Sequence, residues 1–86
     1  MKILFTRQAQ KDLERIKQDK ALVKRVRILL DILSKNPLQN PPQFEKLVGD
    51  LKGAYSRRIN NKHRLVYRIV EDEVWIIAMW SHYENV

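Results

Sequence analysis

Three prolines within residues 37–42 divide this chain into two parts whose apolar residues follow different periods. A proline disfavours the helical conformation for the residue before it, so a helix that enters this segment has to end there. Before the prolines, apolar residues recur every three or four positions, as on one face of a helix. From Phe44 onward the period changes to two, as in strands. Helices followed by strands predict an α+β fold.

Two helices are predicted before the prolines. Thr6 can cap a first helix that runs to about Gln18, and Asp19 stands where the N-cap of a second helix belongs. Residues 2–5 precede both as a short strand. The second helix carries an apolar stripe at helical spacing, which is typical of a face that packs on a core: Leu22, Val26, Leu29, Leu30 and Leu33.

Four strands are predicted after the prolines, in the segments FEKL, AYSRRI, HRLVYRIV and VWIIAMW, which are rich in β-branched and aromatic residues. The turns between them are short, and short turns join antiparallel neighbours. Because there is no repeat and no long linker, residues 1–86 are expected to form a single domain. The predicted architecture is a short N-terminal strand and a two-helix hairpin packed on one face of an antiparallel β-sheet.

The formal net charge of +7 gives this small domain a positive field that attracts nucleic acids, anionic membrane surfaces or acidic proteins. The predicted helices lack the exposed aromatic and leucine face of a membrane-surface helix, and no stretch approaches the ~20 apolar residues of a spanning one. No membrane partner is therefore expected. The absence of cysteine excludes a disulfide framework and a thiolate metal site, and it fits a reducing cytosol.

Polar residues gather on one predicted face of the sheet. Side chains along residues 56–68 should point alternately to the two faces of the sheet, so one alternating set should face the helices and the other should face away from them. The helix-facing set is Ile59, Leu65, Tyr67 and Ile69, and the opposite set is Ser56, Arg58, Arg64, Val66 and Arg68.

The loop lengths decide which of these residues meet. A three-residue loop at residues 60–62 places Arg58 directly across from Arg64, whereas a two-residue type I′ turn, which Asn-Asn also suits, pairs Arg58 with His63 instead. A three-residue loop at residues 71–73 places Arg64 across from Trp80, with His82 one step diagonal to it. Two facing arginines are more stable with an anion such as a phosphate between them.

Each of these residues also has an ordinary structural interpretation. Arginines on a strand face often serve only solubility, and a histidine near a terminus is often a surface residue. Tyr83 can pack at a sheet edge or offer a stacking surface for a base. Trp75 and Trp80 are expected in the core or at an interface.

Taken together, a carboxylate (Glu45), two arginines (Arg58 and Arg64) and an imidazole (His82) are the groups needed for RNA cleavage without a metal ion. A base takes the proton of the 2′-hydroxyl, arginines stabilise the charge that builds on phosphorus oxygens, and an acid protonates the departing 5′-oxygen. The sequence offers neither an acidic cluster for magnesium nor a His/Cys set for zinc. No cofactor is expected.

The segments SRRINNKHRLVY and the terminal HY resemble the Txe/YoeB family of bacterial toxins, within the RelE/ParE superfamily. The resemblance extends from the opening MKI to the terminal SHY. It implies a RelE/ParE-like fold and a cytoplasmic, ribosome-dependent endoribonuclease that cuts messenger RNA in the decoding site. It also implies a YefM/Phd-type antitoxin as partner, contact with operator DNA only through the antitoxin complex, and a possible homodimer.

The resemblance also implies roles for individual residues. By motif position, Glu45 matches the general base, Arg64 the phosphate-stabilising arginine and His82 the general acid. Tyr83 matches a residue that helps hold the substrate, and Arg58 a further arginine of the active face. Some relatives have a lysine where Val48 stands, so Lys46 or Lys52 is expected to contact the RNA in its place.

Two other functions stay open from the sequence. A ParE-like gyrase poison would bind a protein target and need no acid–base set. A non-catalytic member would survive as a corepressor that binds the antitoxin. The presence of Glu45, Arg64 and His82 favours the ribonuclease over both alternatives.

Overall fold

The computed structural model describes residues 1–80, in which the predicted order of helices and strands is confirmed. Strand β1 (Lys2–Phe5) leads into helices α1 (Arg7–Ile16) and α2 (Lys20–Lys35). The second part contains β2 (Glu45–Lys46), a 3₁₀ turn η1 (Gly49–Leu51), β3 (Ala54–Arg58), β4 (Arg64–Val70) and β5 (Glu73–Ala78). No helix within residues 1–80 is long and apolar enough to cross a membrane.

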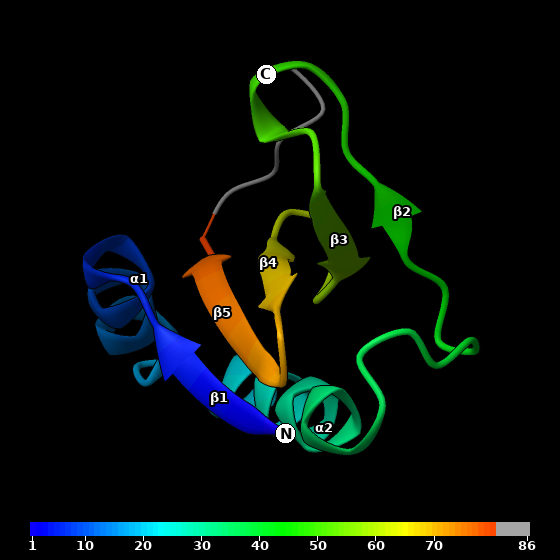
Figure 1. The fold of residues 1–86 in the computed structure, drawn as a ribbon. Coiled ribbons are helices and arrows are strands. Elements are labelled where there is room, and N and C mark those ends of the chain that lie inside the picture. The colour runs from blue at the N-terminus through cyan, green and yellow to red at the C-terminus, as the bar shows by residue number, and fades with distance from the viewer. Residues whose placement is uncertain (81–86) are drawn as a thin grey trace.

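The five strands form one sheet in the order β1-β5-β4-β3-β2 (Figure 1). Strands β2 to β5 are antiparallel neighbours, as predicted, but β1 pairs with β5 in parallel, so the sheet is mixed. The pairing is extended at the end of β1, where the backbone N–H of Thr6 donates to the carbonyl of Ile76 (3.0 Å) and its hydroxyl donates to the carbonyl of Ile77 (2.9 Å). No turn joins β1 to β5, and therefore no local sequence signal predicts their relative direction.

Both helix starts have the predicted caps. The Thr6 hydroxyl accepts from the backbone N–H of Ala9 (3.2 Å), and the Asp19 carboxylate accepts from those of Ala21 and Leu22. Each cap satisfies backbone donors that a helix cannot pair internally.

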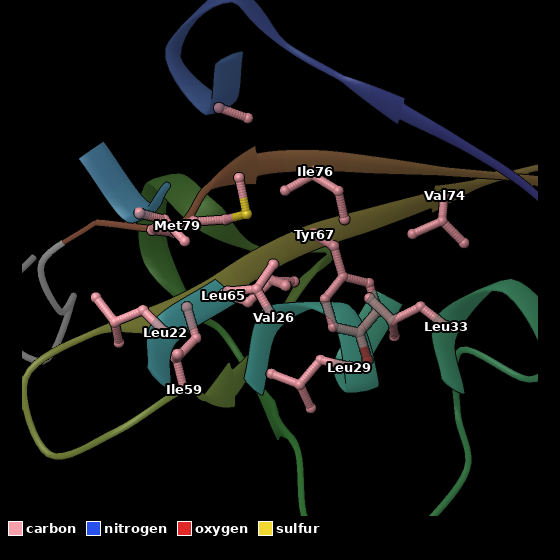
Figure 2. Packing of buried hydrophobic residues seen from close by; sticks show 12 residues of the cluster. Leu22, Val26, Leu29, Leu33, Ile59, Leu65, Tyr67, Val74, Ile76 and Met79 are labelled. Carbon is pink, nitrogen blue, oxygen red and sulfur yellow. The ribbon is translucent and has the colours of Figure 1, made fainter. Parts of the chain in front are cut away.

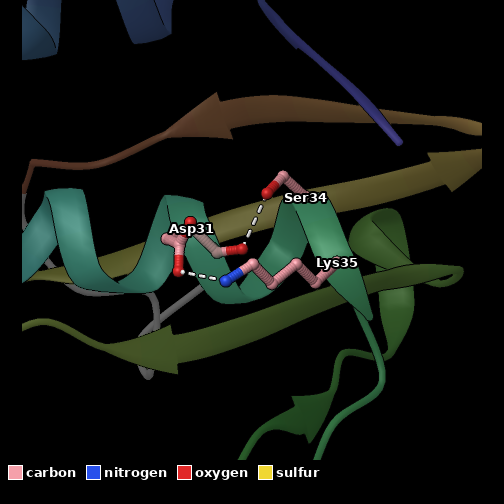
Figure 3. A network of polar contacts seen from close by, with 3 residues as sticks. All are labelled: Asp31, Ser34 and Lys35. Carbon is pink, nitrogen blue, oxygen red and sulfur yellow. Dashed lines mark hydrogen bonds and ion pairs between the residues drawn. The ribbon is translucent and has the colours of Figure 1, made fainter.

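The last turn of α2 carries polar contacts at its surface (Figure 3). Lys35 Nζ pairs with Asp31 Oδ2 at 3.2 Å, and the Ser34 hydroxyl donates to the Asp31 carbonyl at 2.7 Å. Both members of the ion pair are well exposed, so this pair adds little to stability.

The core lies between the two helices and the sheet, and most of it is packed under α2 (Figure 2). The predicted stripe of α2 packs against the predicted helix-facing side of β3 and β4, joined by residues of β5 and the segment after it. The buried members of the stripe are Leu22, Val26, Leu29 and Leu33, and their partners include Ile59, Leu65, Tyr67, Val74, Ile76 and Met79. The remaining members of the two predicted sets, Leu30 and Ile69, are partly buried against this cluster.

The turn between β3 and β4 has the three-residue loop, residues 60–62. Arg58 faces Arg64, and the backbone N–H of Ile59 donates to the His63 carbonyl at 2.9 Å. The Asn60 side-chain oxygen accepts from the backbone N–H groups of Lys62 and His63, both at 2.8 Å. This side chain therefore closes the turn and selects the longer of the two predicted loops.

The turn between β4 and β5 differs from the prediction. Val70 faces Glu73, so the loop has two residues instead of three, and Glu71 adopts a left-handed conformation with φ 57°. Farther along, a β-bulge shifts the register by one residue, and Val66 faces Ala78. The bulge thus restores the register that a three-residue loop would have given at this end of the sheet.

Trp80 packs against the core, as predicted, but its predicted pairing with Arg64 is not formed, because the β4–β5 ladder ends at Val66 and Ala78. Its ring stacks on His63, with ring centroids 4.2 Å apart, and the Arg15 guanidinium of α1 lies 5.5 Å from the ring centre. Stacking and cation–π attraction hold the indole beside α1, where it covers part of the core.

Asp12 of α1 ties the end of β5 to the helices. Its side chain is 3% exposed, and Oδ2 accepts from the backbone N–H groups of Met79 (2.9 Å) and Trp80 (3.3 Å). The other oxygen, Oδ1, accepts from the Gln8 amide at 2.8 Å. One buried carboxylate thereby satisfies backbone donors that lie beyond the last strand pair.

We predict that Asp12→Ala lowers the free energy of unfolding by about 2–3 kcal/mol, because two backbone donors lose a charged acceptor. Urea unfolding followed by circular dichroism measures this change. Glu14→Ala is the control on the same helix, since Glu14 forms only an exposed pair with Lys17 and its loss should cost under about 0.5 kcal/mol. Equal midpoints for the two variants would contradict the role given to Asp12.

Candidate functional site

The strand pairing brings Glu45 and Arg64 to the face of the sheet that points away from the core. Residues directly opposite each other in antiparallel strands share a face. Glu45 faces Ser56, Ser56 faces Val66, and the next pair of β3 and β4 on the same face is Arg58 with Arg64. Glu45 and Arg64 are therefore diagonal neighbours across β3.

Arg64 is held from two sides. Its Nη2 forms an ion pair with Glu45 Oε1, and its Nε donates to the Ser56 hydroxyl at 2.7 Å. The Arg64 side chain is 17% exposed, whereas that of Glu45 is 56% exposed. The guanidinium is thus fixed in orientation while the carboxylate is open to solvent and to a ligand.

A hollow of about 380 Å³ opens beside this ion pair. It is lined by Pro42, Gln43, Glu45, Arg57, Arg58 and Arg64. Three guanidinium groups and one carboxylate leave an excess of positive charge. Guanidinium groups bind phosphate oxygens through paired hydrogen bonds, so the hollow suits a phosphodiester.

The structure does not bring the two predicted lysines to this hollow. Lys46 faces Tyr55, so it lies on the opposite face of the sheet from Glu45. Lys52 is exposed after η1, and its carbonyl accepts from Arg68 Nη1 at 3.0 Å. Val48, which stands where some relatives have a lysine, is 82% exposed. Neither lysine is among the residues that line the hollow.

His82 and Tyr83 lie outside the described residues, so the structure does not test the predicted acid and the predicted substrate contact. The chain reaches them two and three residues after Trp80. Within residues 1–80, no group of three or more His, Cys, Asp or Glu side chains is placed to hold a metal ion.

Arg57 is a residue of the site that the sequence interpretation missed. Its side chain is wholly buried, yet it lines the hollow from beneath. Arg57 Nη1 donates to the Pro42 carbonyl at 2.6 Å, and Nη2 donates to the carbonyls of Pro37 (3.0 Å) and Gln39 (2.8 Å). The sequence did contain a signal for this role. The alternation in SRRI places Arg57 with Ile59 on the helix-facing side, where a charged side chain needs hydrogen-bond partners.

Tyr67 completes this buried network. Its hydroxyl accepts from Arg57 Nε at 3.1 Å and donates to the Pro37 carbonyl at 2.7 Å. Burial raises the pKa of the Tyr67 phenol above its ordinary value of 10.0, and the hydrogen bond and charge of Arg57 oppose that increase. The neutral phenol is therefore the form that the folded chain favours.

Comparison with known proteins identifies the family. A family model described as "YoeB-like toxin of bacterial type II toxin-antitoxin system" matches residues 5–83. The chain belongs to the YoeB toxin family. A Synechocystis protein named Toxin YoeB is 39% identical over 86 residues, which cover 99% of this chain and all of the relative.

Solved structures of YoeB toxins share the fold. An Agrobacterium tumefaciens structure titled YoeB/ParE toxin is 30% identical, with a TM-score of 0.89 over 96% of this chain and 100% of that chain. A Staphylococcus aureus YoeB is 39% identical, with a TM-score of 0.84 over 96% of this chain and 98% of that chain. It has been solved in a heterotetrameric YoeB–YefM toxin–antitoxin complex and as a dimer. The RelE/ParE-like α+β fold and the toxin family predicted from the sequence are thus confirmed.

We predict that stability falls above about pH 10 and that Tyr67→Phe reduces this loss. Above that pH the tyrosine of the unfolded chain gives up its proton while the buried phenol keeps it, so ionisation favours the unfolded state by up to ~1.4 kcal/mol per pH unit. Urea midpoints between pH 8 and 11 measure the slope. Tyr55→Phe is the matched control, because it removes a neighbouring phenol and leaves Tyr67 in place. Identical slopes for wild type and Tyr67→Phe would contradict the assignment.

Proposed function

We propose that this YoeB-family toxin is a ribosome-dependent endoribonuclease that cuts messenger RNA in the decoding site without a metal ion. The observation that carries the proposal is the Glu45–Arg64 pair beside a hollow rich in guanidinium groups. A carboxylate and a cation that share one hydrogen bond can act together on a hydroxyl and its adjacent phosphate.

The resting ion pair suggests how substrate engages the site. When a phosphodiester enters the hollow, one of its non-bridging oxygens competes with Glu45 for the donors of Arg64. The Ser56 hydroxyl still holds Nε, so the guanidinium keeps its orientation during this exchange. Glu45 is then released to accept the proton of the 2′-hydroxyl, and Arg58 on the facing strand supplies a second cation.

The proposed reaction balances as an internal transesterification. The 2′-oxygen, having given its proton to Glu45, attacks phosphorus, and the bond from phosphorus to the 5′-oxygen breaks. His82 gives its proton to the departing 5′-oxygen, which leaves a 2′,3′-cyclic phosphate and a 5′-hydroxyl. Arg64 and Arg58 stabilise the additional negative charge on the phosphorus oxygens, and Tyr83 helps hold the RNA.

We also propose a YefM/Phd-type antitoxin as the partner that neutralises the toxin, with operator DNA contacted only through that complex. The S. aureus relative forms a YoeB–YefM complex, and its fold matches this chain closely. The hollow and the net charge of +7 favour an acidic partner segment. A homodimer is proposed because that relative has been solved as a dimer.

We predict that Arg64→Ala lowers the rate of messenger RNA cleavage by about 30- to 1000-fold, equivalent to ~2–4 kcal/mol of transition-state stabilisation. Single-turnover cleavage on programmed ribosomes, with toxin in excess, measures the rate. Arg68→Ala is the matched control, because Arg68 lies on the same face of β4 but is absent from the lining of the hollow.

A cleavage rate in Arg64→Ala equal to that of Arg68→Ala would reject the assignment. Loss of cleavage in His82→Ala, with ribosome binding retained, is expected for the proposed acid. Toxicity that persists in both catalytic variants together with DNA damage would instead favour a gyrase poison.

A further inference from the structure

Among residues 1–80, no carboxylate forms an ion pair with the buried guanidinium of Arg57. Within residues 1–80, every hydrogen bond of Arg57 goes to a neutral oxygen, and none of its contacts is an ion pair. Burying a charge is costly unless hydrogen bonds compensate for lost water. A buried charge that carries this cost suggests that Arg57 has a role that a neutral side chain cannot fill.

The bonds of Arg57 converge on the proline-rich segment before β2. Prolines 37, 41 and 42 have no backbone N–H, and the N–H groups of Leu38 and Gln39 donate to Asn36 within a local turn, so few donors of this segment remain for strand pairing. Its carbonyls still need donors when they are buried. The forked guanidinium of Arg57 donates to three of these carbonyls, those of residues 37, 39 and 42. It also lies 5.0 Å from the ring centre of Phe44.

The segment that Arg57 holds leads directly to the proposed base. Glu45 follows Phe44 and belongs to β2, an edge strand of only two residues. So short an edge strand gives little fixed geometry of its own. The ring of Phe44 also meets Tyr55 edge-on at 5.6 Å, so the residue before Glu45 packs on both Arg57 and β3.

We propose that Arg57 is a positioning residue that fixes Glu45 against Arg64 by anchoring residues 37–44 from beneath. This inference rests on the proposed function, in which Glu45 is the general base. Arginine suits the task better than lysine, because its planar fork offers five donors in fixed directions, whereas an ammonium offers three on a flexible stem. Through this anchor, a buried residue whose hydrogen bonds within residues 1–80 go to Tyr67 and to backbone carbonyls sets the distance between base and phosphate.

The first test is a double-mutant cycle of Arg57→Lys with Glu45→Gln, measured by single-turnover cleavage on programmed ribosomes. Arg57→Lys keeps the charge and loses the fork. We expect it to lower the saturating cleavage rate at least 10-fold. The toxin concentration that gives half of this rate should stay within about 3-fold of the wild-type value. In the Glu45→Gln background the same substitution should change the rate less than 2-fold. An equal loss in both backgrounds would overturn the inference.

The second test needs no catalysis. Hydrogen exchange of the full chain should become faster at the backbone amides of residues 38–40 and 43–46 in Arg57→Lys, and stay unchanged at the core amides of β4 and β5. Unchanged exchange at residues 38–46 would overturn the inference. If Glu45→Gln itself cleaves at the wild-type rate, the proposed base is rejected, and the exchange data alone decide whether Arg57 orders this segment.

A milder variant covers the case in which Arg57→Lys fails to fold. Tyr67→Phe removes the hydroxyl that accepts from Arg57 Nε and donates to the Pro37 carbonyl, and it keeps the ring in the core. We expect a 2- to 5-fold slower cleavage that is absent in the Glu45→Gln background. Tyr55→Phe, which keeps both of these bonds, is the control and should cleave like wild type. A Tyr67→Phe loss of equal size in both backgrounds would contradict the proposal.

Discussion

The register between β3 and β4 is the constraint on which the site depends. In a sheet, a slip of one residue moves every side chain to the other face. The Asn60 side chain closes a three-residue turn, and that turn places Arg58 across from Arg64 and Ser56 across from Val66. With the alternative two-residue turn, Arg64 would leave the face that Glu45 occupies. One amide side chain at the far end of the hairpin thus determines which charges meet.

Two buried charged side chains then connect irregular backbone to this frame. Asp12 accepts from the N–H groups that follow β5, and Arg57 donates to the carbonyls that precede β2. The Asp12 carboxylate accepts from backbone N–H groups and the Arg57 guanidinium donates to backbone carbonyls, and strand pairing satisfies neither set. A chain of 86 residues buries a limited apolar core, so polar anchors of this kind contribute a large share of its local order. Along the chain, the first segment is followed by His82 and the second by Glu45, the residues proposed as acid and base.

Local signals in the sequence predicted most of the fold. The caps at Thr6 and Asp19, the apolar stripe of α2 and the alternation along β3 and β4 each depend on nearby residues, and the structure confirms them. The parallel pairing of β1 was not predictable in this way, because its partner β5 lies at the other end of the chain. The two-residue turn at residues 71–72 was missed because the bulge that accompanies it leaves no distinctive residue type.

The candidate site was predictable in part. Glu45, Arg58 and Arg64 were assigned from motif and parity, and the structure brings them to one hollow. Lys46, predicted as an RNA contact, lies on the face of the sheet opposite Glu45, as strand alternation alone indicates. Arg57 was missed because its partners are backbone carbonyls of an irregular segment, and no residue pattern reports where such carbonyls point.

The bulge in β5 governs how changes in chain length affect this fold. Val74 and Ile76 point into the core, and strict alternation would send Ala78 there as well. The additional residue at Ile77 instead places Ala78 opposite Val66 on the other face and sends Met79 inward. Deleting Ile77 would remove the bulge and leave Ala78 opposite Val66 and Met79 inward, so the residues downstream would keep their faces. The hairpin tip at residues 71–72 has no spare residue of this kind, and losing one there would change the pairing of β4 with β5. In the evolution of such a strand, the location of a deletion matters more than its size.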